Sequence, residues 1–254
     1  MTTESWGQPS HTPNEEAEAK KHTGTSSKIL RGEQKEPFGI GTMGVATQEK
    51  ITVTRKNKAR GIDLVTKYFT QRDGPDSLES AVSAFKMLKE AGVTHLPVTY
   101  REIGPSEIVM TDYNHGGRVA IGGNRNEKAK EVRIESIHNL PELLSSIDED
   151  LRRAANAKIR IHADSFFFLI PTSGKNANVD FVIGDFGGIT RTGGNSLYLV
   201  NVMQAGKALL NFILLHVSGE RYEEYEKQIR GWVASAGEKP DADALANEAM
   251  DRGA

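Results

Sequence analysis

Hydrophobic and polar positions divide the chain into two parts with different periods. In residues 38–114, apolar residues alternate with polar ones or form short runs, which is typical of β-strands. The predicted strands lie at 51–53, 62–69, 98–100 and 108–110. One helix is predicted between them, from Ser77 to Ala91, because its apolar residues recur every three or four positions. Asp76 or Ser77 can cap this helix, and Gly92 ends it.

Helices dominate from residue 142 onward, with two short apolar strands at 166–170 and 181–183. The first helix is expected to begin after the cap residue Asn139, with Pro141 in its first turn. Its apolar side consists of Leu143, Leu144, Ile147, Leu151 and Ala154. A strand-rich half followed by a helical half predicts an α+β protein with two lobes.

A second long helix is predicted at 197–217 and is apolar on most of its surface. Its length would suit a membrane span. However, four polar residues lie three or four positions apart on one stripe, where hydrocarbon would make them costly. They are Asn201, Gln204, Lys207 and Asn211. We therefore expect a buried core helix and no membrane association.

The two ends of the chain are polar. Residues 1–36 contain few apolar side chains, so this segment cannot bury enough surface to offset the entropy of ordering, and we expect a disordered tail. Residues 237–254 form a second polar tail. Between them we expect a small strand-rich lobe at 37–114 and a helical lobe at 115–236.

Composition narrows the classes of function. A chain of 254 residues with 37% hydrophobic residues can bury a sizeable core. The formal net charge of -2 gives no general attraction to nucleic acid or to an anionic membrane. The sequence has no cysteine, which excludes disulfides, thiolate metal sites and a cysteine nucleophile. We expect a cytoplasmic enzyme or binding protein.

A glycine motif, Gly39-Ile40-Gly41-Thr42-Met43-Gly44, precedes the strand at 51–53. A dinucleotide-binding loop would have to open a helix, so the Rossmann interpretation fails. Glycines between two strands suit a hairpin in which the backbone of Gly39, Gly41 and Gly44 closes over nucleotide phosphates. The alternative is a glycine linker that leaves the tail.

Lys67 lies in the predicted strand at 62–69. If its side chain points beneath the glycine hairpin, its ammonium can pair with the α- and β-phosphates of a nucleotide. Such a lysine usually needs a carboxylate from the following helix, and Glu79 is the first candidate, ahead of Glu90. The alternative is an ordinary solvated lysine.

Two aspartates follow predicted strands in the helical half. Asp185, in Asp185-Phe186-Gly187, comes at the end of a buried strand and can hold Mg²⁺ on nucleotide phosphates. Asp164, in His162-Ala163-Asp164, lies in the preceding loop and can orient an attacking hydroxyl and accept its proton. Both aspartates could instead be turn or cap residues.

The order of these motifs resembles the protein-kinase-like superfamily over roughly residues 38–219, and the regions around 91–114 and after Asp185 are similar to atypical and aminoglycoside- or choline-kinase-like members. The resemblance implies a bilobal fold with a small β-rich N-lobe and a compact helical C-lobe. It implies ATP and Mg²⁺ as cofactors, with Lys67 on the phosphates, Asp164 as the catalytic aspartate and Asp185 as the metal ligand. The hinge that holds adenine would be Met110, Thr111, Asp112 and Tyr113.

The chain departs from the family pattern where a metal-binding asparagine is expected, because Leu169 stands there. Asn176 and Asn178 would substitute only if their turn folded back. We therefore keep two hypotheses: a minimal ATP- and Mg²⁺-dependent phosphotransferase, and a pseudokinase that acts as a nucleotide-binding or regulatory interaction module. Nucleotidyl transfer by the same fold is a third. The acceptor substrate, protein or small molecule, stays open.

A basic patch near the predicted catalytic loop could attract an anionic substrate, or it could be a solvated helix face. It consists of Arg152, Arg153, Lys158 and Arg160.

Overall fold

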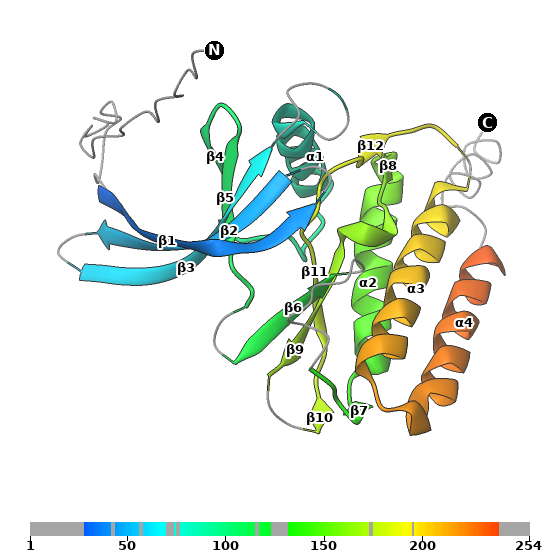
Figure 1. Ribbon diagram of the computed structural model, residues 1–254. Coiled ribbons are helices and arrows are strands. Elements are labelled where there is room, and N and C mark those ends of the chain that lie inside the picture. Colours follow the sequence, from blue (N-terminus) through cyan, green and yellow to red (C-terminus); the bar gives the residue numbers. More distant parts are fainter. Residues whose placement is uncertain are drawn as a thin grey trace, which may run out of the picture.

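The structure is a computed structural model. It describes residues 28–41, 44–55, 58–69, 74, 77–114, 117–122, 132–172, 175–194 and 196–238, with the backbone alone for the strands before Leu64. The predictions for residues 1–27 and 239–254 lie outside these ranges, as do Thr42 and Met43 of the glycine motif. The described part is an α+β protein in which a five-stranded sheet precedes a mainly helical half (Figure 1).

The first half is an antiparallel sheet with the strand order β1-β2-β3-β5-β4 (Figure 1). Its strands are β1 (Lys28–Gly41), β2 (Gly44–Arg55), β3 (Lys58–Phe69), β4 (Tyr100–Gly104) and β5 (Glu107–Thr111). β1 already begins at Lys28, so the tail predicted for residues 1–36 extends too far. The first residues of β1 are mostly polar, so the apolar pattern does not predict a strand there. The strand forms by backbone pairing with β2.

Helix α1 (Leu78–Glu90) confirms the helix predicted between the strands. Ser77 caps it, because its Oγ accepts a hydrogen bond from the Ser80 amide at 3.2 Å. Gly92 follows with a φ of 79°, a left-handed conformation that suits glycine. The strand predicted at 98–100 is displaced: Val98 is 91% exposed, and β4 begins at Tyr100, where pairing with Met110 starts.

Three long helices form the other side of the molecule and lie side by side in Figure 1. They are α2 (Leu140–Asn156), α3 (Leu197–His216) and α4 (Tyr222–Glu238). Asn139 occupies the cap position of α2 as predicted, but its side chain makes no cap hydrogen bond. Instead its amide group exchanges two hydrogen bonds with the backbone of Val179, at 2.8 and 2.9 Å, and so joins α2 to the strand that follows.

Small sheets connect the helices to the large sheet. Strands β6 (Arg118–Gly122), β9 (Phe166–Pro171) and β11 (Asp180–Ile183) form an antiparallel sheet in the order β11-β9-β6. Two further pairs are β7 (Ser136–Ile137) with β10 (Asn176–Ala177), and β8 (Ile159–Arg160) with β12 (Thr190–Arg191). The apolar runs predicted at 166–170 and 181–183 are thus confirmed as the strands β9 and β11.

Strand β9 separates two environments. Phe166, Phe168 and Ile170 are at most 1% exposed, and the Phe168 ring stacks on Phe212 of α3 with centroids 4.8 Å apart. Phe167 is half-buried on the other side, close to Gly122 and Gly184. The two-residue period of the strand therefore gives β9 one face toward the helical core and one toward the large sheet.

Helix α3 is the one described helix with the length and composition of a membrane span. In this structure it packs between α2 and α4 (Figure 1). Within the apolar stretch of α3 that could span a membrane, 56% is buried inside the protein. The polar residue Asn201 is completely buried in it, where hydrogen bonds to the protein backbone offset the loss of hydration.

Candidate functional site

Lys67 and Asp185 meet between the two halves of the molecule. Lys67 lies on β3, and Asp185 follows β11, 118 positions later in the chain. The Lys67 Nζ lies 3.0 Å from the Asp185 Oδ1, and the two side chains are 18% and 29% exposed. The ammonium also lies 5.2 Å from the ring centre of Phe69, two residues along the same strand face. An ion pair with this partial exposure keeps both charges within reach of a ligand.

Helix α1 does not supply the carboxylate expected for Lys67. Among the described residues, Asp185 is the carboxylate that pairs with this ammonium. Glu79 lies in the first turn of α1 and is exposed, and Glu90 is exposed at its last residue. The position of Glu79 suits the positive end of the helix dipole instead. The predicted pairing of Lys67 with Glu79 is therefore replaced by a pairing with Asp185.

Asp164 lies in a one-turn 3-10 helix, Ala163–Ser165, directly before β9. Its side chain is exposed. The turn is closed by the Ser165 amide, which donates to the His162 carbonyl at 3.1 Å. The Gly184 amide donates to the Ser165 carbonyl at 3.0 Å. This last bond extends the pairing of β9 with β11 by one step, so the loop of Asp164 is held beside the residue that precedes Asp185.

Two polar residues of α3 hold the Asp164 loop. The Asn201 Oδ1 accepts from the Ile161 amide at 2.9 Å, and its Nδ2 donates to the Ile159 carbonyl at 2.9 Å. The Gln204 Oε1 accepts from the Ala163 amide at 3.2 Å. In the sequence these residues count only as evidence against a membrane span. Their spacing of three residues places them on the same side of α3, and this is the one feature of the sequence that could have predicted a shared contact with the backbone of a single loop.

An aromatic cluster supports the segment of Asp185. Phe186 is 1% exposed and packs edge-on against Phe85 of α1 and Tyr100 of β4, at centroid distances of 5.4 and 4.7 Å. Phe85 and Tyr100 stack on each other at 4.7 Å. Burial raises the pKa of the Tyr100 hydroxyl far above its usual range, and the nearby negative charge of Asp185 raises it further. Nothing in the local sequence singles out Tyr100, which the fold brings to Asp185.

The predicted hinge lies at the end of β5 and just after it. Met110 and Thr111 belong to β5, and the Thr111 Oγ1 accepts from the Thr99 amide at 2.9 Å. Asp112 is completely buried, and its Oδ1 accepts from the Asn114 amide at 2.8 Å. The backbone of Met110 and Thr111 pairs with β3, Met110 also pairs with Tyr100 of β4, and the Thr111 amide donates to the Thr99 carbonyl at 3.0 Å.

Tyr113 completes the predicted hinge. Its hydroxyl donates to the Leu96 carbonyl at 3.5 Å. Burial raises the pKa of this hydroxyl. Tyr113 therefore ties the end of the hinge to the loop between α1 and β4.

The glycine motif forms the turn between β1 and β2, as predicted for a hairpin. Gly41 pairs with Gly44, and Gly39 pairs with Ala46. Ala46 in turn pairs with Lys67 on β3. Gly44 therefore pairs with β3 directly, opposite Phe69, whereas Gly39 and Gly41 lie one strand further from Lys67.

The metal-binding asparagine of the family pattern has no substitute in the turn after β9. Leu169 is 5% exposed within β9. Asn176 lies in β10, beyond the far end of β9 from Asp185, and its Oδ1 accepts from the Ser136 Oγ at 2.6 Å. Asn178 is exposed in the same region. A six-residue strand spans about 20 Å, so these two residues are too distant to reach Asp185.

Two arginines of the basic patch form ion pairs with acidic residues of α2. Arg152 pairs with Asp148 at 2.8 Å and donates to the Tyr198 hydroxyl. Arg153 pairs with Asp150 at 2.8 Å. Lys158 and Arg160 are exposed. The two arginines thus connect helices and loops, which weakens the interpretation of this patch as a docking surface for an anionic substrate.

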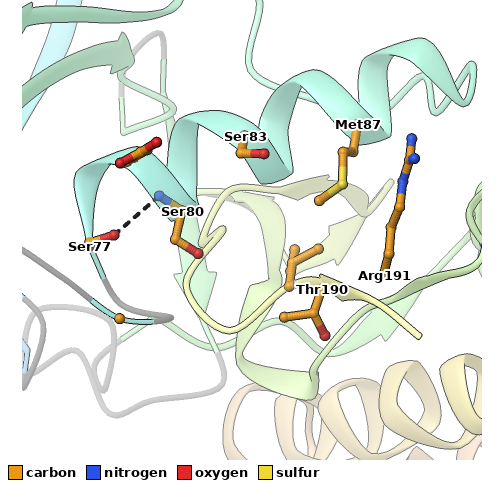
Figure 2. Close-up of a pocket in the computed structure, with 9 residues that line it drawn as sticks. Ser77, Ser80, Ser83, Met87, Thr190 and Arg191 are labelled. Atoms are coloured by element: carbon orange, nitrogen blue, oxygen red, sulfur yellow. Dashed lines mark hydrogen bonds between the residues drawn. The ribbon is translucent and has the colours of Figure 1, made fainter.

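A cavity of about 430 Å³ is present, and its lining does not include the Lys67–Asp185 pair. Figure 2 shows it between α1 and the segment after Asp185. Its lining is rich in hydroxyl groups and carries one carboxylate and one guanidinium: Gly74, Ser77, Glu79, Ser80, Ser83, Met87, Ile189, Thr190 and Arg191. The site residues Lys67, Asp164 and Asp185 lie outside this lining.

Oxygen donors for a cation come from few side chains. No group of three or more His, Cys, Asp or Glu side chains in the described part of the chain could hold a metal ion. The Ser165 Oγ is the one buried side-chain nitrogen or oxygen atom, among the described residues, that has no hydrogen-bond partner.

Compared with models of known protein families and with curated protein sequences, the chain has no match.

Proposed function

We propose that this protein is an ATP- and Mg²⁺-dependent phosphotransferase of a minimal, atypical kinase type, with a bilobal protein-kinase-like fold. The observation that carries the proposal is the contact of Lys67 Nζ with Asp185 Oδ1 at 3.0 Å. It joins a sheet strand beside a glycine hairpin to a loop of the helical half. Phosphoryl transfer needs a fixed cation and a metal-binding carboxylate at one place, since positioning and charge stabilisation supply most of its catalysis.

The residues divide the work as follows. Lys67 binds α- and β-phosphate oxygens beneath the backbone of Gly39, Gly41 and Gly44. Asp185 holds Mg²⁺, which neutralises charge on the phosphates when it is bound. Asp164, exposed at the edge of the same site, orients the acceptor hydroxyl and accepts its proton. Met110 and the backbone that follows it hold adenine.

The donor set is compatible with Mg²⁺, which is usually bound by one or two carboxylates together with phosphates and water. Asp185 is one such carboxylate. A single carboxylate fits a magnesium-nucleotide complex better than a cage formed by protein alone, and no group of three or more metal-binding side chains is found among the described residues.

Transfer of labelled γ-phosphate from ATP, either to the protein itself or to a panel of small hydroxyl compounds and proteins, tests this function. Asp185→Asn should abolish transfer. Asp180→Asn is the matched control, because Asp180 is exposed on the strand that leads to Asp185. Nucleotide binding by the wild type without transfer to any acceptor would contradict the phosphotransferase proposal.

Two observations favour the second candidate, a pseudokinase. Leu169 is buried where the family pattern has a metal-binding asparagine, and α1 supplies no carboxylate to Lys67. Such a protein would bind nucleotide and act as a regulatory interaction module. Melting temperatures with ATP alone and with ATP plus Mg²⁺ separate the two, because a ligand of the native state raises the melting temperature. Stabilisation by ATP that Mg²⁺ does not change favours the pseudokinase.

A further inference from the structure

Positive charge is concentrated at one end of the large sheet. Residues 28–32, 50–55 and 58–62 contain six of the 32 basic residues of the chain and none of its 34 acidic residues. The remaining 26 basic and 34 acidic residues give the rest of the chain a formal net charge of -8. The net charge of -2 for the whole protein conceals this separation, because the two parts nearly cancel.

This charge lies where three strands extend beyond the rest of the sheet. β3 pairs with β5 only from Leu64 to Tyr68, so residues 58–63 of β3 pair with β2 and not with β5. Figure 1 shows β1, β2 and β3 projecting together away from the helices. We call this part of the sheet, residues 28–31, 51–55 and 58–62, the sheet extension.

The strand register places four basic residues on one face of the sheet extension. Directly paired residues of antiparallel strands share a face, and successive residues along a strand alternate between faces. From the outer end inward, the rows on this face are Arg55 and Lys58; Ile29, Val53 and Arg60; and Arg31, Ile51 and Ile62. These eight residues, four basic and four aliphatic, form what we call the basic face.

The basic face is opposite to the face that carries Lys67. On β3, Arg60 and Leu64 lie an even number of residues apart and share one face, whereas Lys67 and Phe69 lie on the other. Phe69 belongs to the main hydrophobic core, while Leu64 forms a separate small cluster with Val109. The basic face is therefore turned away from the helical half, and a partner on it would not cover the candidate nucleotide site.

The residue types of the basic face favour a lipid surface over a nucleic acid. Its eight positions hold no aromatic residue on which the bases of a single strand could stack, and no Asn or Gln that could read base edges. They hold Ile and Val beside Arg and Lys. Proteins that bind at a membrane surface combine these two kinds of residue, because apolar groups enter the headgroup region and cations are attracted to anionic lipids.

We propose that the basic face of the sheet extension docks the protein on an anionic lipid surface. The four basic residues bind the anionic headgroups, and the four aliphatic residues lie at the level of these headgroups. The negative charge of the rest of the chain is repelled by the same surface, which orients the protein with the basic face toward the lipid. This docking is not a membrane span and does not involve α3. It also needs no nucleotide, so it is independent of the proposed phosphotransferase activity.

Sedimentation of the full-length protein with phosphatidylcholine vesicles, with and without phosphatidylserine, tests the docking. We expect binding only to vesicles that contain phosphatidylserine, and weaker binding at high salt because salt screens the charges. The double variant Arg55→Gln and Lys58→Gln should lower the affinity roughly 25-fold, since each basic residue near such a surface contributes about fivefold.

A matched control makes the same charge change on the helical half. Lys158 and Arg160 are exposed there, and the double variant Lys158→Gln and Arg160→Gln should bind vesicles like the wild type. An equal loss of affinity in both double variants overturns the proposal. So does an absence of binding to phosphatidylserine vesicles at low salt.

A fluorescent label identifies the face that meets the lipid. The chain has no cysteine, so a single introduced cysteine can carry a label whose emission depends on its surroundings. Val53→Cys places the label on the basic face, and Thr52→Cys places it on the opposite face of the same strand. With phosphatidylserine vesicles, the emission should shift to shorter wavelength at position 53 and stay unchanged at position 52. Equal emission changes at the two positions overturn the assignment of the face.

A nucleic acid is the competing partner for a basic surface. A double-stranded oligonucleotide that binds the wild type more tightly than the vesicles do at the same salt concentration, and less tightly after Arg55→Gln and Lys58→Gln, overturns the lipid proposal. The two proposals for this protein fail separately. Phosphate transfer by a protein that binds no vesicles leaves only the phosphotransferase, and vesicle binding without phosphate transfer leaves only the docking surface.

Discussion

The Asp150 carboxylate on α2 accepts hydrogen bonds from both the backbone amide and the ring Nδ1 of His95, at 2.9 and 2.8 Å. His95 lies in the loop between α1 and β4. Its ring stacks on Phe181 at 4.2 Å, and its carbonyl accepts from the Ile183 amide at 2.8 Å. Asp150 therefore fixes the end of the α1 segment to the strand that leads to Asp185. This connection holds the sheet half and the helical half in one relative position.

Replacing Asp150 should destabilise the whole protein. Its side chain is 1% exposed, and it accepts further bonds from the Thr94 amide and from Arg153. Asp150→Asn removes the negative charge. It also replaces one accepting oxygen by an NH₂ group, which cannot accept a hydrogen bond from these donors. Losing one partner of such a buried cluster costs roughly 3 kcal/mol, measurable by urea unfolding. Glu149→Gln, an exposed neighbour in a surface ion pair, should change stability by less than about 1 kcal/mol. Equal effects would contradict this role of Asp150.

The same carboxylate predicts sensitivity to acid. Burial alone would raise the pKa of Asp150, but the hydrogen bonds from His95 and Thr94 outweigh it and lower the pKa to about 2. Because this value lies below that of the unfolded chain, the stabilisation is complete above about pH 5 and is lost as the pH falls toward about 2. The difference in unfolding free energy between wild type and Asp150→Asn should therefore shrink from about pH 5 to about pH 2.5. A difference that stays constant would show that ionisation of Asp150 contributes nothing.

The hydrogen bonds of Asn201 should matter for both stability and activity. Asn201→Leu keeps a similar volume but leaves the Ile161 amide and the Ile159 carbonyl without partners inside the core. Two such groups cost roughly 3 kcal/mol together. Because Asn201 anchors the loop of Asp164, the phosphate transfer proposed above should decrease as well. The same substitution at Asn211, on the exposed side of α3, should stay within about 0.5 kcal/mol of wild type. Urea unfolding of the two variants side by side checks the prediction.

Gly206 of α3 should resist substitution because α4 approaches it closely. A Cβ atom at this position would lie 2.7 Å from the Val233 Cγ2. Gly206→Ala gains about 1 kcal/mol of helix propensity but forces the two helices apart, at a cost of about 1–3 kcal/mol. We expect a net loss of stability by thermal unfolding.

Two further variants separate crowding from helix propensity. Val233→Ala should make room, so that adding Gly206→Ala in that background is harmless or stabilising. Gly231 lies on the exposed side of α4, and a Cβ atom placed there would have no neighbouring atom within 4 Å. Gly231→Ala should therefore raise stability by about 0.5–1 kcal/mol. A stabilising effect of Gly206→Ala in the wild-type background would contradict close contact between α3 and α4.

Much of the secondary structure can be predicted from single segments. The helix α1 has a capping serine, a regular apolar side and a terminating glycine, and β9 is a continuous apolar run between polar loops. The prediction of β4 is displaced because Val98 and Thr99 look like strand residues, while the actual strand consists mostly of exposed polar residues that pair with β5. β1 begins inside the tail predicted for residues 1–36 for a similar reason, since backbone pairing needs no apolar pattern.

The candidate site is only partly predictable. Lys67 and Asp185 stand out as single charged residues in or just after apolar strands, and the sequence suggests each of them separately. It does not predict their mutual contact, since Glu79 is the carboxylate expected for the lysine. Tyr100 gives no signal either, because an isolated tyrosine at the start of a polar strand is common, and only the fold brings it to Phe186 beside Asp185.

The sequence by itself determined the α+β character of the protein and the positions of its main helices, because apolar periodicity and capping residues act over a few neighbouring positions. Tertiary structure decided which charges meet. Lys67 faces Asp185 across 118 positions, and Asp150 holds His95 across 55. Such contacts depend on how strands and helices pack against one another. A pattern over a few neighbouring residues does not determine contacts between residues so far apart in the sequence. The candidate site is a product of this packing.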